Sequence, residues 1–376
     1  MLVLSFVVAA IVILLGLLSG LLMFWRLPVP SAEDDVTCTN HSTFISIIIP
    51  ARNEEHRIVP LLQSLSQQEG ISFETIVIDD DSEDRTSEVA SSYHARVIRN
   101  TPPEDGWIGK SAACWTGAQA AKGKFLLFLD ADTAFEKPDS LLRYVNSYEQ
   151  MDGKGILSLQ PYHQIEQVYE NASMIFNIIV MAGMNVFTPL GERLTSAGSF
   201  GPSILCNRAD YDISGGHAGI RGAVMDDLAL GEAFQSQDLP VRCYGGRGLI
   251  RFRMYPEGFK QLLEGWTKNF GTASKSTHPF VMMLVNLWIT GGFVSPVLLA
   301  LTGMFGSPFW ITFAVVLYLL NVIEMAWLAR RTGNFSWWIF SIYPLLLVFF
   351  TVVFVYSLYL THVRKTVSWR GRDVHV

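Results

Sequence analysis

Long stretches without a single charged side chain, at both ends of the chain, constrain its fold more than any other feature. No Asp, Glu, Lys or Arg occurs in residues 1–25, 276–323 or 332–363. A helix that crosses a bilayer needs about 20 predominantly apolar residues. These stretches predict an N-terminal transmembrane anchor at 1–25 and a membrane region of two to three helices at 279–361, followed by a basic tail at 362–376.

The number of spanning helices in the C-terminal region stays open. Three crossings that start in the cytoplasm would place the basic tail outside, whereas basic residues favour the cytoplasmic side. The alternative is that one segment re-enters the membrane or lies in its interface. Breaks at Gly306-Ser307-Pro308 and at Arg330-Arg331-Thr332-Gly333 divide the region into segments at about 280–304, 309–328 and 337–360. The basic residues of the tail are Arg364, Lys365, Arg370 and Arg372.

A large polar domain lies between the membrane segments, at residues 26–278. It holds all of the 34 acidic residues except Glu324 and Asp373. An acidic domain argues against a nucleic-acid partner, which needs a basic surface. Because Arg26 directly follows the anchor, we expect this domain in the cytoplasm and the protein to be a multi-pass protein of the cell membrane. The four cysteines form no Cys-x-x-Cys pair and predict free thiols in a reducing compartment.

A shorter apolar segment, 171–190, interrupts the polar domain. It is only just long enough to span a membrane, and Asn171, Asn177 and Asn185 interrupt it. We favour a helix that lies on the membrane surface. A helix buried in the core is the alternative.

Apolar runs alternate with helix-like segments between residues 44 and 130. The runs FISIIIP, FETIVIDD and FLLFLDAD are rich in Ile, Val, Leu and Phe, as in strands that are buried on both faces. The helix-like segments cover 54–68 and 110–121. Strands that alternate with helices at this spacing predict a parallel sheet in an α/β domain.

Three polar clusters follow these runs, and in α/β sheets ligands bind outside the carboxyl ends of the strands. Asp130 and Asp132 of the last cluster can hold Mg²⁺ or Mn²⁺ against a diphosphate. A turn is the alternative for that pair, and helix capping by Asp81 or Ser82 is the alternative for the second cluster. The clusters are Pro-Ala-Arg-Asn-Glu-Glu at 50–55, Asp-Asp-Asp-Ser at 79–82 and Asp-Ala-Asp at 130–132.

In this order the clusters resemble the family 2 glycosyltransferases of the GT-A fold. The resemblance covers most of residues 44–270. It implies a Rossmann-like α/β domain that binds a nucleoside-diphosphate sugar and a divalent metal, Mg²⁺ or Mn²⁺. The further matching stretches are Trp107-Ile108-Gly109-Lys110-Ser111, Gly215-Gly216 and Met225-Asp226-Asp227-Leu228.

A finer pattern resembles the bacterial 4,4'-diaponeurosporenoate glycosyltransferases of carotenoid biosynthesis. This resemblance implies transfer of glucose from UDP-glucose to the carboxylate of a C30 carotenoid acid, which gives a glycosyl ester. Processive polysaccharide synthases have Arg-Trp where this sequence has Gly265-Trp266, which favours a single transfer over polymerisation. The stretches that carry the finer pattern include Gly109-Lys110-Ser111-Ala112-Ala113-Cys114, Phe200-Gly201-Pro202 and Arg253-Met254-Tyr255-Pro256-Glu257.

The family resemblance also implies a role for individual residues on the donor side. Asp80 meets the uracil, Asp130 faces the ribose and the diphosphate, and Asp132 binds the metal. Lys110 lies near the diphosphate, where a cation offsets the charge of the leaving group; a solvated lysine at a helix start is the alternative. The residues that line the nucleotide pocket are Ala51, Arg52 and Glu54.

An acidic pair near the start of a helix supplies the catalytic base in this fold. Its second member corresponds to Asp227, with Asp226 as the alternative. The base takes the acceptor's proton while the acceptor attacks opposite the departing UDP, so the configuration at the sugar is inverted. A carboxylic acid acceptor has a pKa of about 4 and is already ionised near neutral pH. With such an acceptor, Asp227 would orient the donor sugar instead.

Basic and aromatic residues are the candidates for holding the acceptor. Arginine suits a carboxylate best because its planar fork binds both oxygens. Surface or structural roles are the alternatives, and an anchor at the membrane interface is the alternative for the tryptophan. The candidates are His217, Arg251, Arg253, Lys268 and, for stacking on the sugar or the acceptor, Trp266.

The leading hypothesis is therefore an inverting UDP-sugar transferase whose acceptor is dissolved in the bilayer. One alternative is transfer to another lipid, such as a polyprenyl phosphate, a hopanoid or diacylglycerol. A second is a catalytically silent membrane module that binds nucleotide or assembles enzymes of the same lipid pathway. The joint presence of Asp130, Asp132 and Asp227 disfavours the silent module.

Overall fold

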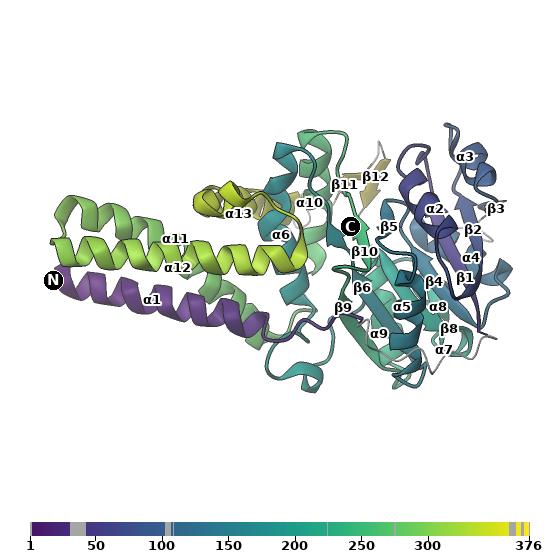
Figure 1. Cartoon of the computed structure of the whole chain (residues 1–376), viewed down its shortest axis with the longest axis horizontal. Helices are drawn as coiled ribbons and strands as arrows, with labels where there is room; N and C mark the ends of the chain where they lie inside the picture. The colour runs from purple at the N-terminus through teal and green to yellow at the C-terminus, as the bar shows by residue number, and fades with distance from the viewer. Residues whose placement is uncertain are drawn as a thin grey trace. The chain divides into compact units, whose positions relative to one another are not determined.

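The computed structural model forms two units, and the chain passes between them more than once (Figure 1). The α/β unit comprises Pro28–His163 and Ser196–Met254. The apolar unit comprises Met1–Leu27, Gln164–Thr195 and Tyr255–Val376. Within these ranges, the residues that the structure describes are 2–30, 43–101, 107, 109–223, 225–273, 276–360, 366–369 and 372–375.

A seven-stranded sheet forms the centre of the α/β unit, with the strand order β3-β2-β1-β4-β8-β6-β9. The predicted parallel pairing is confirmed for β1 to β4, whereas β8 runs antiparallel to both of its neighbours. Strand β6, which lies on the other side of β8 from β4, pairs in parallel with β9. The strands are β1 (Phe44–Ala51), β2 (Ser72–Asp79), β3 (Arg96–Arg99), β4 (Phe125–Leu129), β6 (Ile156–Gln160), β8 (Ser203–Asn207) and β9 (Val241–Gly245).

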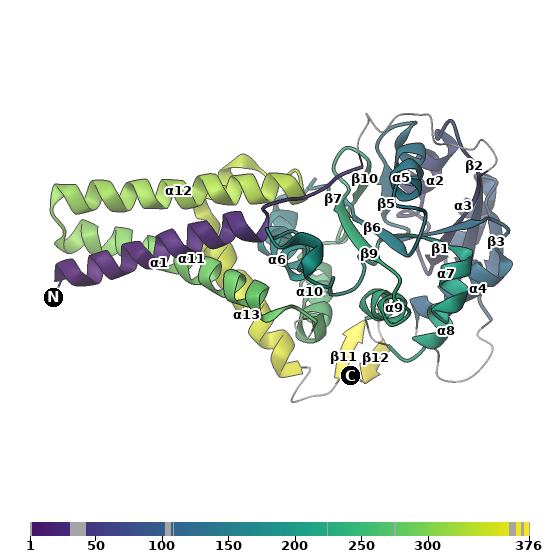
Figure 2. The ribbon, with the colours of Figure 1, turned by 90° about the horizontal axis from the view of Figure 1, so that it is seen from below.

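Helices cover both faces of this sheet, which is why its strands carry apolar side chains on both sides. Figure 2 shows α2 and α5 on one side of the strands and α4, α7 and α8 on the other. The first face buries Leu61 and Tyr144 in one cluster with Ile47. The second face buries Cys114 and Phe234 in a separate cluster with Ile48. The helices are α2 (Val59–Ser66), α3 (Thr86–Ser92), α4 (Lys110–Ala120), α5 (Ser140–Glu149), α7 (Arg208–Ile213), α8 (Gly216–Gly219) and α9 (Asp226–Gln235).

A second, three-stranded sheet begins directly after the Asp-Ala-Asp segment. Its order is β5-β10-β7, with β10 antiparallel to β5 and parallel to β7. The Arg253 N–H donates to the carbonyl oxygen of Asp132 at 3.2 Å. The sheet therefore brings the segment around Arg253 beside the predicted metal-binding residue. The strands are β5 (Thr133–Phe135), β7 (Tyr162–His163) and β10 (Ile250–Phe252).

In the apolar unit, α1, α11 and α12 lie side by side (Figures 1 and 2). A Cβ atom added to Gly16 of α1 would lie 2.9 Å from the Gly291 Cα of α11, so small residues permit this close approach. The Arg331 guanidinium donates to the Phe24 carbonyl oxygen at 2.9 Å, so α1 and α12 finish at the same end. The elements are α1 (Leu2–Met23), η2 (Val168–Ser173), α6 (Met174–Gly183), η3 (Gly191–Arg193), α10 (Phe259–Ala273), α11 (Pro279–Phe305), α12 (Pro308–Thr332), η4 (Trp337–Ile342), α13 (Tyr343–Tyr359), β11 (Thr366–Trp369) and β12 (Arg372–His375).

Among the described residues, four helical segments are long and apolar enough to cross a membrane. Their bounds lie close to those of the predicted N-terminal and C-terminal membrane segments. Each is long enough to cross a bilayer. The chain is accordingly a membrane protein. The segments are Val3–Met23, Pro279–Phe305, Pro308–Thr332 and Trp337–Tyr359.

The last of these segments does not run along the whole length of its neighbours. The Ser336 N–H donates to an asparagine of η2 at 2.8 Å, shortly after α12 ends. The Tyr318 hydroxyl, near the middle of α12, donates to the Ser341 carbonyl oxygen at 2.6 Å. The Ser357 hydroxyl then donates to the Thr267 carbonyl oxygen in α10, the helix that leads into α11. This path is compatible with the re-entrant alternative, and whether η4–α13 crosses the membrane stays a prediction.

The apolar segment predicted at 171–190 forms the short helix α6. Its side chains Met174, Phe176 and Ile178 are buried, and the helix contacts α11, α12 and α13. This burial matches the alternative of a buried helix. A location on the membrane surface stays a prediction.

The alternative for the second cluster, in which Asp81 or Ser82 caps a helix, is wrong. Helix α3 begins four residues later, at Thr86, and no side chain caps it. The Ser82 N–H donates instead to Asp79 Oδ1 at 2.9 Å, which closes a turn at the end of β2. The loop between Asp79 and Thr86 is therefore not part of a helix, and it contacts the loop that follows β1.

Candidate active site

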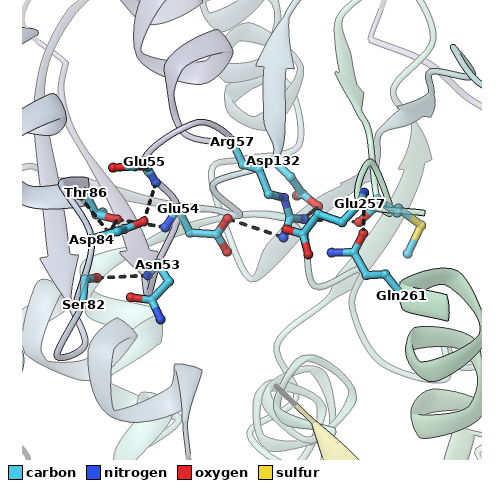
Figure 3. Close-up of polar contacts among 11 residues, drawn as sticks. Asn53, Glu54, Glu55, Arg57, Ser82, Asp84, Thr86, Asp132, Glu257 and Gln261 are labelled. Carbon is cyan, nitrogen blue, oxygen red and sulfur yellow. Dashed lines mark hydrogen bonds and ion pairs between the residues drawn. The ribbon is translucent and has the colours of Figure 1, made fainter. Parts of the chain in front are cut away.

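A ladder of hydrogen bonds joins the loop after β1 to the loop after β2 (Figure 3). Burial would raise the pKa of Asp84, but hydrogen bonds from Thr86 and from backbone N–H groups outweigh it and lower that pKa below its usual value. The ladder fixes the turn in which Glu54 sits. Three successive backbone N–H groups donate across it, namely Asn53 to Ser82 Oγ, Glu54 to Thr86 Oγ1 and Glu55 to Asp84 Oδ2, at 3.1, 2.8 and 3.1 Å.

The residues predicted to bind the nucleotide lie together at the ends of β1 and β2. Ala51 pairs with Asp79 in the sheet register, one position before Asp80. The Arg52 guanidinium donates to the Asp80 carbonyl oxygen at 3.0 Å. The Asn100 amide donates to Asp80 Oδ1 at 2.7 Å. Asp80 is therefore held in one orientation at the strand ends, where a nucleotide base would bind.

Arg57 joins Glu54 to Asp132. Its guanidinium lies 2.9 Å from Asp132 Oδ2 and 3.4 Å from Glu54 Oε2, and it also donates to the Met254 carbonyl oxygen at 3.3 Å. Burial raises the pKa of Asp132 to about 6, Arg57 opposes that rise, and the carboxylates of Asp130 and Glu54 add to it. The site therefore concentrates negative charge around Asp132, and Arg57 offsets part of it.

Lys110 forms an ion pair with Asp130. The ammonium also donates to the Gly201 carbonyl oxygen at 3.0 Å. Burial lowers the pKa of Lys110, but the negative charges of Asp130 and Asp226 outweigh it and hold that pKa above its usual range. Lys110 is therefore a permanent cation at neutral pH, and its side chain remains about one-third exposed, at 31%.

Asp227 lies at the start of α9 and contacts the loop that also contacts Lys110. Its Oδ2 accepts a hydrogen bond from the Gly201 N–H at 3.1 Å, and its Oδ1 accepts one from the Leu228 N–H at 3.0 Å. A Cβ on Gly201 would lie 2.7 Å from Asp227 Oδ2, so a side chain at this position would displace the Asp227 carboxylate. Burial and the neighbouring Asp226 raise the pKa of Asp227 to about 6, against the opposing charge of Lys110. Such a carboxylate is ionised at neutral pH and can accept a proton.

The donor set around Asp132 fits a divalent cation that is shared with a substrate. Among the described residues, no three His, Cys, Asp or Glu side chains are placed to enclose a metal ion. Mg²⁺ and Mn²⁺ sites of nucleotide-dependent enzymes commonly use one or two carboxylates, with substrate phosphates and water supplying the other oxygens. Asp132, with Asp130 beside it, would provide that protein share.

Two of the predicted acceptor residues are structural. His217 is 3% exposed, its Nδ1 lies 3.0 Å from the Tyr211 hydroxyl, and burial lowers its pKa to about 3. A neutral, buried imidazole does not pair with a carboxylate, so His217 takes the structural role given above as its alternative. Trp266 is also 3% exposed, its indole N–H donates to Ser173 Oγ at 3.0 Å, and its ring stacks on Phe176. Its faces are covered, so stacking on a sugar or acceptor does not fit.

The other three acceptor candidates differ in position. Arg251 lies on β10 with its side chain exposed, and Arg253 follows it and is half-buried. Arg251 pairs with Ala134 of β5, and the Arg253 N–H donates to the Asp132 carbonyl oxygen. Lys268 lies in α10, and its side chain is outside the described residues.

Three residues of this site were not among the predicted ones. Arg57 sits three positions after Glu54, a spacing that brings both side chains to one side of a turn. Asn100 follows β3 and orients Asp80. Gly201 precedes a proline, and a Gly-Pro pair is a turn signal, but its contact with Asp227 spans 26 residues and carries no local pattern.

The chain is similar to known proteins in sequence and in fold. The family described as Glycosyl transferase family 2 matches residues 46–203. The 4,4'-diaponeurosporenoate glycosyltransferase of Staphylococcus aureus (strain USA300) is 40% identical over 338 residues, which cover 90% of this chain and 89% of that protein. The enzyme of strain MRSA252 gives the same identity and coverage. A mannosyltransferase from Pyrobaculum calidifontis, solved with GDP-Man and Mn²⁺, superposes with a TM-score of 0.51 at 15% identity, covering 92% of this chain and 98% of that one.

The chain therefore belongs to glycosyl transferase family 2 and has the GT-A fold. It is a glycosyltransferase, as the order of the three polar clusters predicts. Its candidate membrane helices precede and follow the residues of the α/β unit in the chain.

Proposed function

We propose that this enzyme transfers glucose from UDP-glucose to the carboxylate of a C30 carotenoid acid resembling 4,4'-diaponeurosporenoate, with inversion, to give a glycosyl ester. The observation that carries the acceptor assignment is the 40% identity to a 4,4'-diaponeurosporenoate glycosyltransferase over nine-tenths of the chain. A carotenoid acid dissolves in the bilayer. This is consistent with an enzyme that has membrane helices both before and after its site residues in the chain.

On the donor side, the nucleotide binds at the ends of β1 and β2. Ala51, Arg52 and Glu54 line its pocket, and Asp80 accepts from the uracil. Asp130 faces the ribose and diphosphate. Lys110 lies against Asp130 and the Gly201 carbonyl oxygen, where its charge offsets that of the departing diphosphate.

Asp132 holds the divalent metal, Mg²⁺ or Mn²⁺. When bound, the metal neutralises negative charge on the leaving diphosphate. Asp130, two residues earlier, would add a second carboxylate.

Asp227 is the base for an acceptor that still carries a proton, and Asp226 is its neighbour and alternative. The hydrogen bonds from Gly201 and Leu228 fix the Asp227 carboxylate, so it can take a proton without a change of position. Towards a carboxylate acceptor, Asp227 binds donor hydroxyls instead. Arg251 and Arg253 hold the acceptor carboxylate, because a guanidinium binds two oxygens at once.

The test of this function uses the detergent-solubilised full chain with Mn²⁺ and UDP-glucose. One reaction receives a C30 carotenoid acid and the other a polyprenyl phosphate, and mass spectrometry identifies the products. We expect a hexosyl ester in the first reaction alone. Product in the second alone would move the acceptor to another lipid. UDP release without product in either reaction would support the donor site but neither of the two acceptors.

With saturating Mn²⁺, which holds Asp132 in its ionised form, the pH dependence of transfer to an alcohol analogue of the acceptor should report the raised pKa of Asp227, about 6. Protonation removes the base, so kcat/KM should fall about tenfold for each pH unit below that value. With the carboxylic acid the acid limb should move towards the acceptor's own pKa, about 4. A pH–rate profile for each acceptor measures both. An identical acid limb for the two acceptors would contradict the assignment.

For the location, we propose the cell membrane, with the α/β unit and the C-terminal tail both in the cytoplasm. Basic residues Arg26, Arg330 and Arg331 lie at the end of the bundle where α1 and α12 finish, as expected for the cytoplasmic side. In this proposal η4–α13 is the re-entrant segment, and α1, α11 and α12 are the spanning helices. The tail residues Arg364, Lys365 and Arg370 lie outside the described residues.

An epitope tag at the C-terminus tests this topology. It should be protected from protease in intact cells and digested in inverted membrane vesicles. A tag inserted at Gly306, in the turn between α11 and α12, is the matched control and should show the opposite pattern. A C-terminal tag that is cleaved in intact cells would mean that η4–α13 crosses the membrane.

A further inference from the structure

Arg57 is a site cation to which neither the sequence pattern nor the proposed mechanism gives a role. It lies in the turn between β1 and α2, which the hydrogen-bond ladder to the β2 loop holds in place. Its side chain is 16% exposed and contacts Glu54, Asp132 and the Met254 carbonyl oxygen. Figure 3 shows the guanidinium between the two acidic side chains.

The two aspartates of the Asp-Ala-Asp segment each have a cation of their own. Lys110 pairs with Asp130, and Arg57 pairs with Asp132 at 2.9 Å. The side chains of Asp132 and Glu54 are 17% and 10% exposed, so charges act on each other there through little water. At a separation of a few ångströms, partly buried charges interact several times more strongly than in bulk water.

These charges make a bare cation and a cation with a diphosphate very different ligands. A divalent ion that approaches Asp132 alone meets the repulsion of Arg57 and must compete for a carboxylate that is already paired. A nucleoside diphosphate that arrives with the ion brings negative charge of its own, which both Arg57 and the ion attract.

We propose that Arg57 makes metal binding at Asp132 depend on the donor nucleotide, by neutralising Asp132 and Glu54 until a metal–diphosphate complex enters. This inference rests on the donor site of the proposed function and concerns its order of loading. Arg57 is a positioning residue in this scheme, because it acts through Asp132. Its charge, rather than its shape, is what the role requires.

The experiment measures Mn²⁺ binding to the full-length protein in detergent by electron paramagnetic resonance, with and without UDP. The wild-type protein should bind Mn²⁺ weakly without UDP. Arg57→Gln should bind Mn²⁺ alone at least about tenfold more tightly, and UDP should increase its affinity for Mn²⁺ by a smaller factor than in the wild type. Arg57→Lys keeps the charge and should behave as the wild type.

Arg85→Gln is the matched control. Arg85 lies in the adjoining loop and pairs with Glu55 at 3.4 Å, but it is 70% exposed and does not contact Asp132. Its replacement should leave Mn²⁺ binding unchanged. If Arg57→Gln does not fold, as a thermal unfolding curve would reveal, Arg57→Met removes the same charge with a similar side-chain volume.

Weaker Mn²⁺ binding by the uncharged variants in both conditions would overturn the inference and make Arg57 an anchor that shapes Asp132. Unchanged binding would overturn it too and leave Arg57 a link between loops. Failure of UDP and Mn²⁺ to bind the wild-type protein together would instead refute the donor site itself. The outcomes for the inference and for the proposed function are thus distinct.

Discussion

Replacement of Asp132 with alanine is expected to lower the turnover of UDP-glucose by about a thousandfold. The variant loses the carboxylate that we assign to the metal, so the charge that develops on the leaving diphosphate is no longer neutralised. It also leaves Arg57 without its closest partner, 2.9 Å away. Release of UDP, measured with and without acceptor, gives the size of the loss.

Asp81→Ala is the control for that variant. Asp81 belongs to the acidic run after β2, but its side chain is 69% exposed and pairs with Arg99 at the surface. It should keep nearly full activity, because exposed ion pairs contribute little. Unchanged turnover in Asp132→Ala would refute the assignment of the metal to this residue.

Asp227→Asn is expected to separate two kinds of acceptor. With an alcohol acceptor kcat should fall by about a hundredfold to ten-thousandfold, the usual contribution of a general base. With a carboxylate acceptor, which has no proton to give, the loss should stay below about tenfold. The amide can still accept one hydrogen bond at the start of α9, where Asp227 accepts from Gly201 and Leu228. Initial rates with both acceptors at saturating UDP-glucose measure the difference.

Asp226→Asn is the companion variant, because it removes the same charge one position earlier. The acceptor-dependent pattern in Asp226→Asn, and not in Asp227→Asn, would move the base by one residue. If Asp227→Asn lowers kcat equally with both acceptors, the role of Asp227 does not depend on the acceptor, and the assignment is wrong.

The fold and the donor side of the site follow from short-range patterns. Buried strands between residues 44 and 130 are runs of apolar residues, and the polar clusters stand directly after them, so the sheet edge could be predicted. Ala51, Arg52 and Asp80 then meet because their strands pair in register. The antiparallel β8 could not be foreseen, since the chain reaches it only after passing through the apolar unit.

Other parts of the site depend on contacts that leave no local pattern. Arg57 meets Asp132 across 75 residues, and Lys110 meets Gly201 across 91. Burial was the harder property to predict: His217 and Trp266 carry polar atoms that suit a ligand, but each satisfies them inside the protein. Composition also leaves the topology of η4–α13 open, because a re-entrant segment and a spanning segment are equally apolar.

The interleaving of the two units in the chain limits how the enzyme can be made in pieces. A fragment trimmed before Pro28 and after Met254 would still contain residues 164–195, which belong to the apolar unit. In that fragment α6 would lose α11, α12 and α13, and its buried Met174, Phe176 and Ile178 would face water. Such an apolar surface drives aggregation. The α/β unit is therefore not a soluble module attached to a removable anchor, and its production depends on the membrane helices being present.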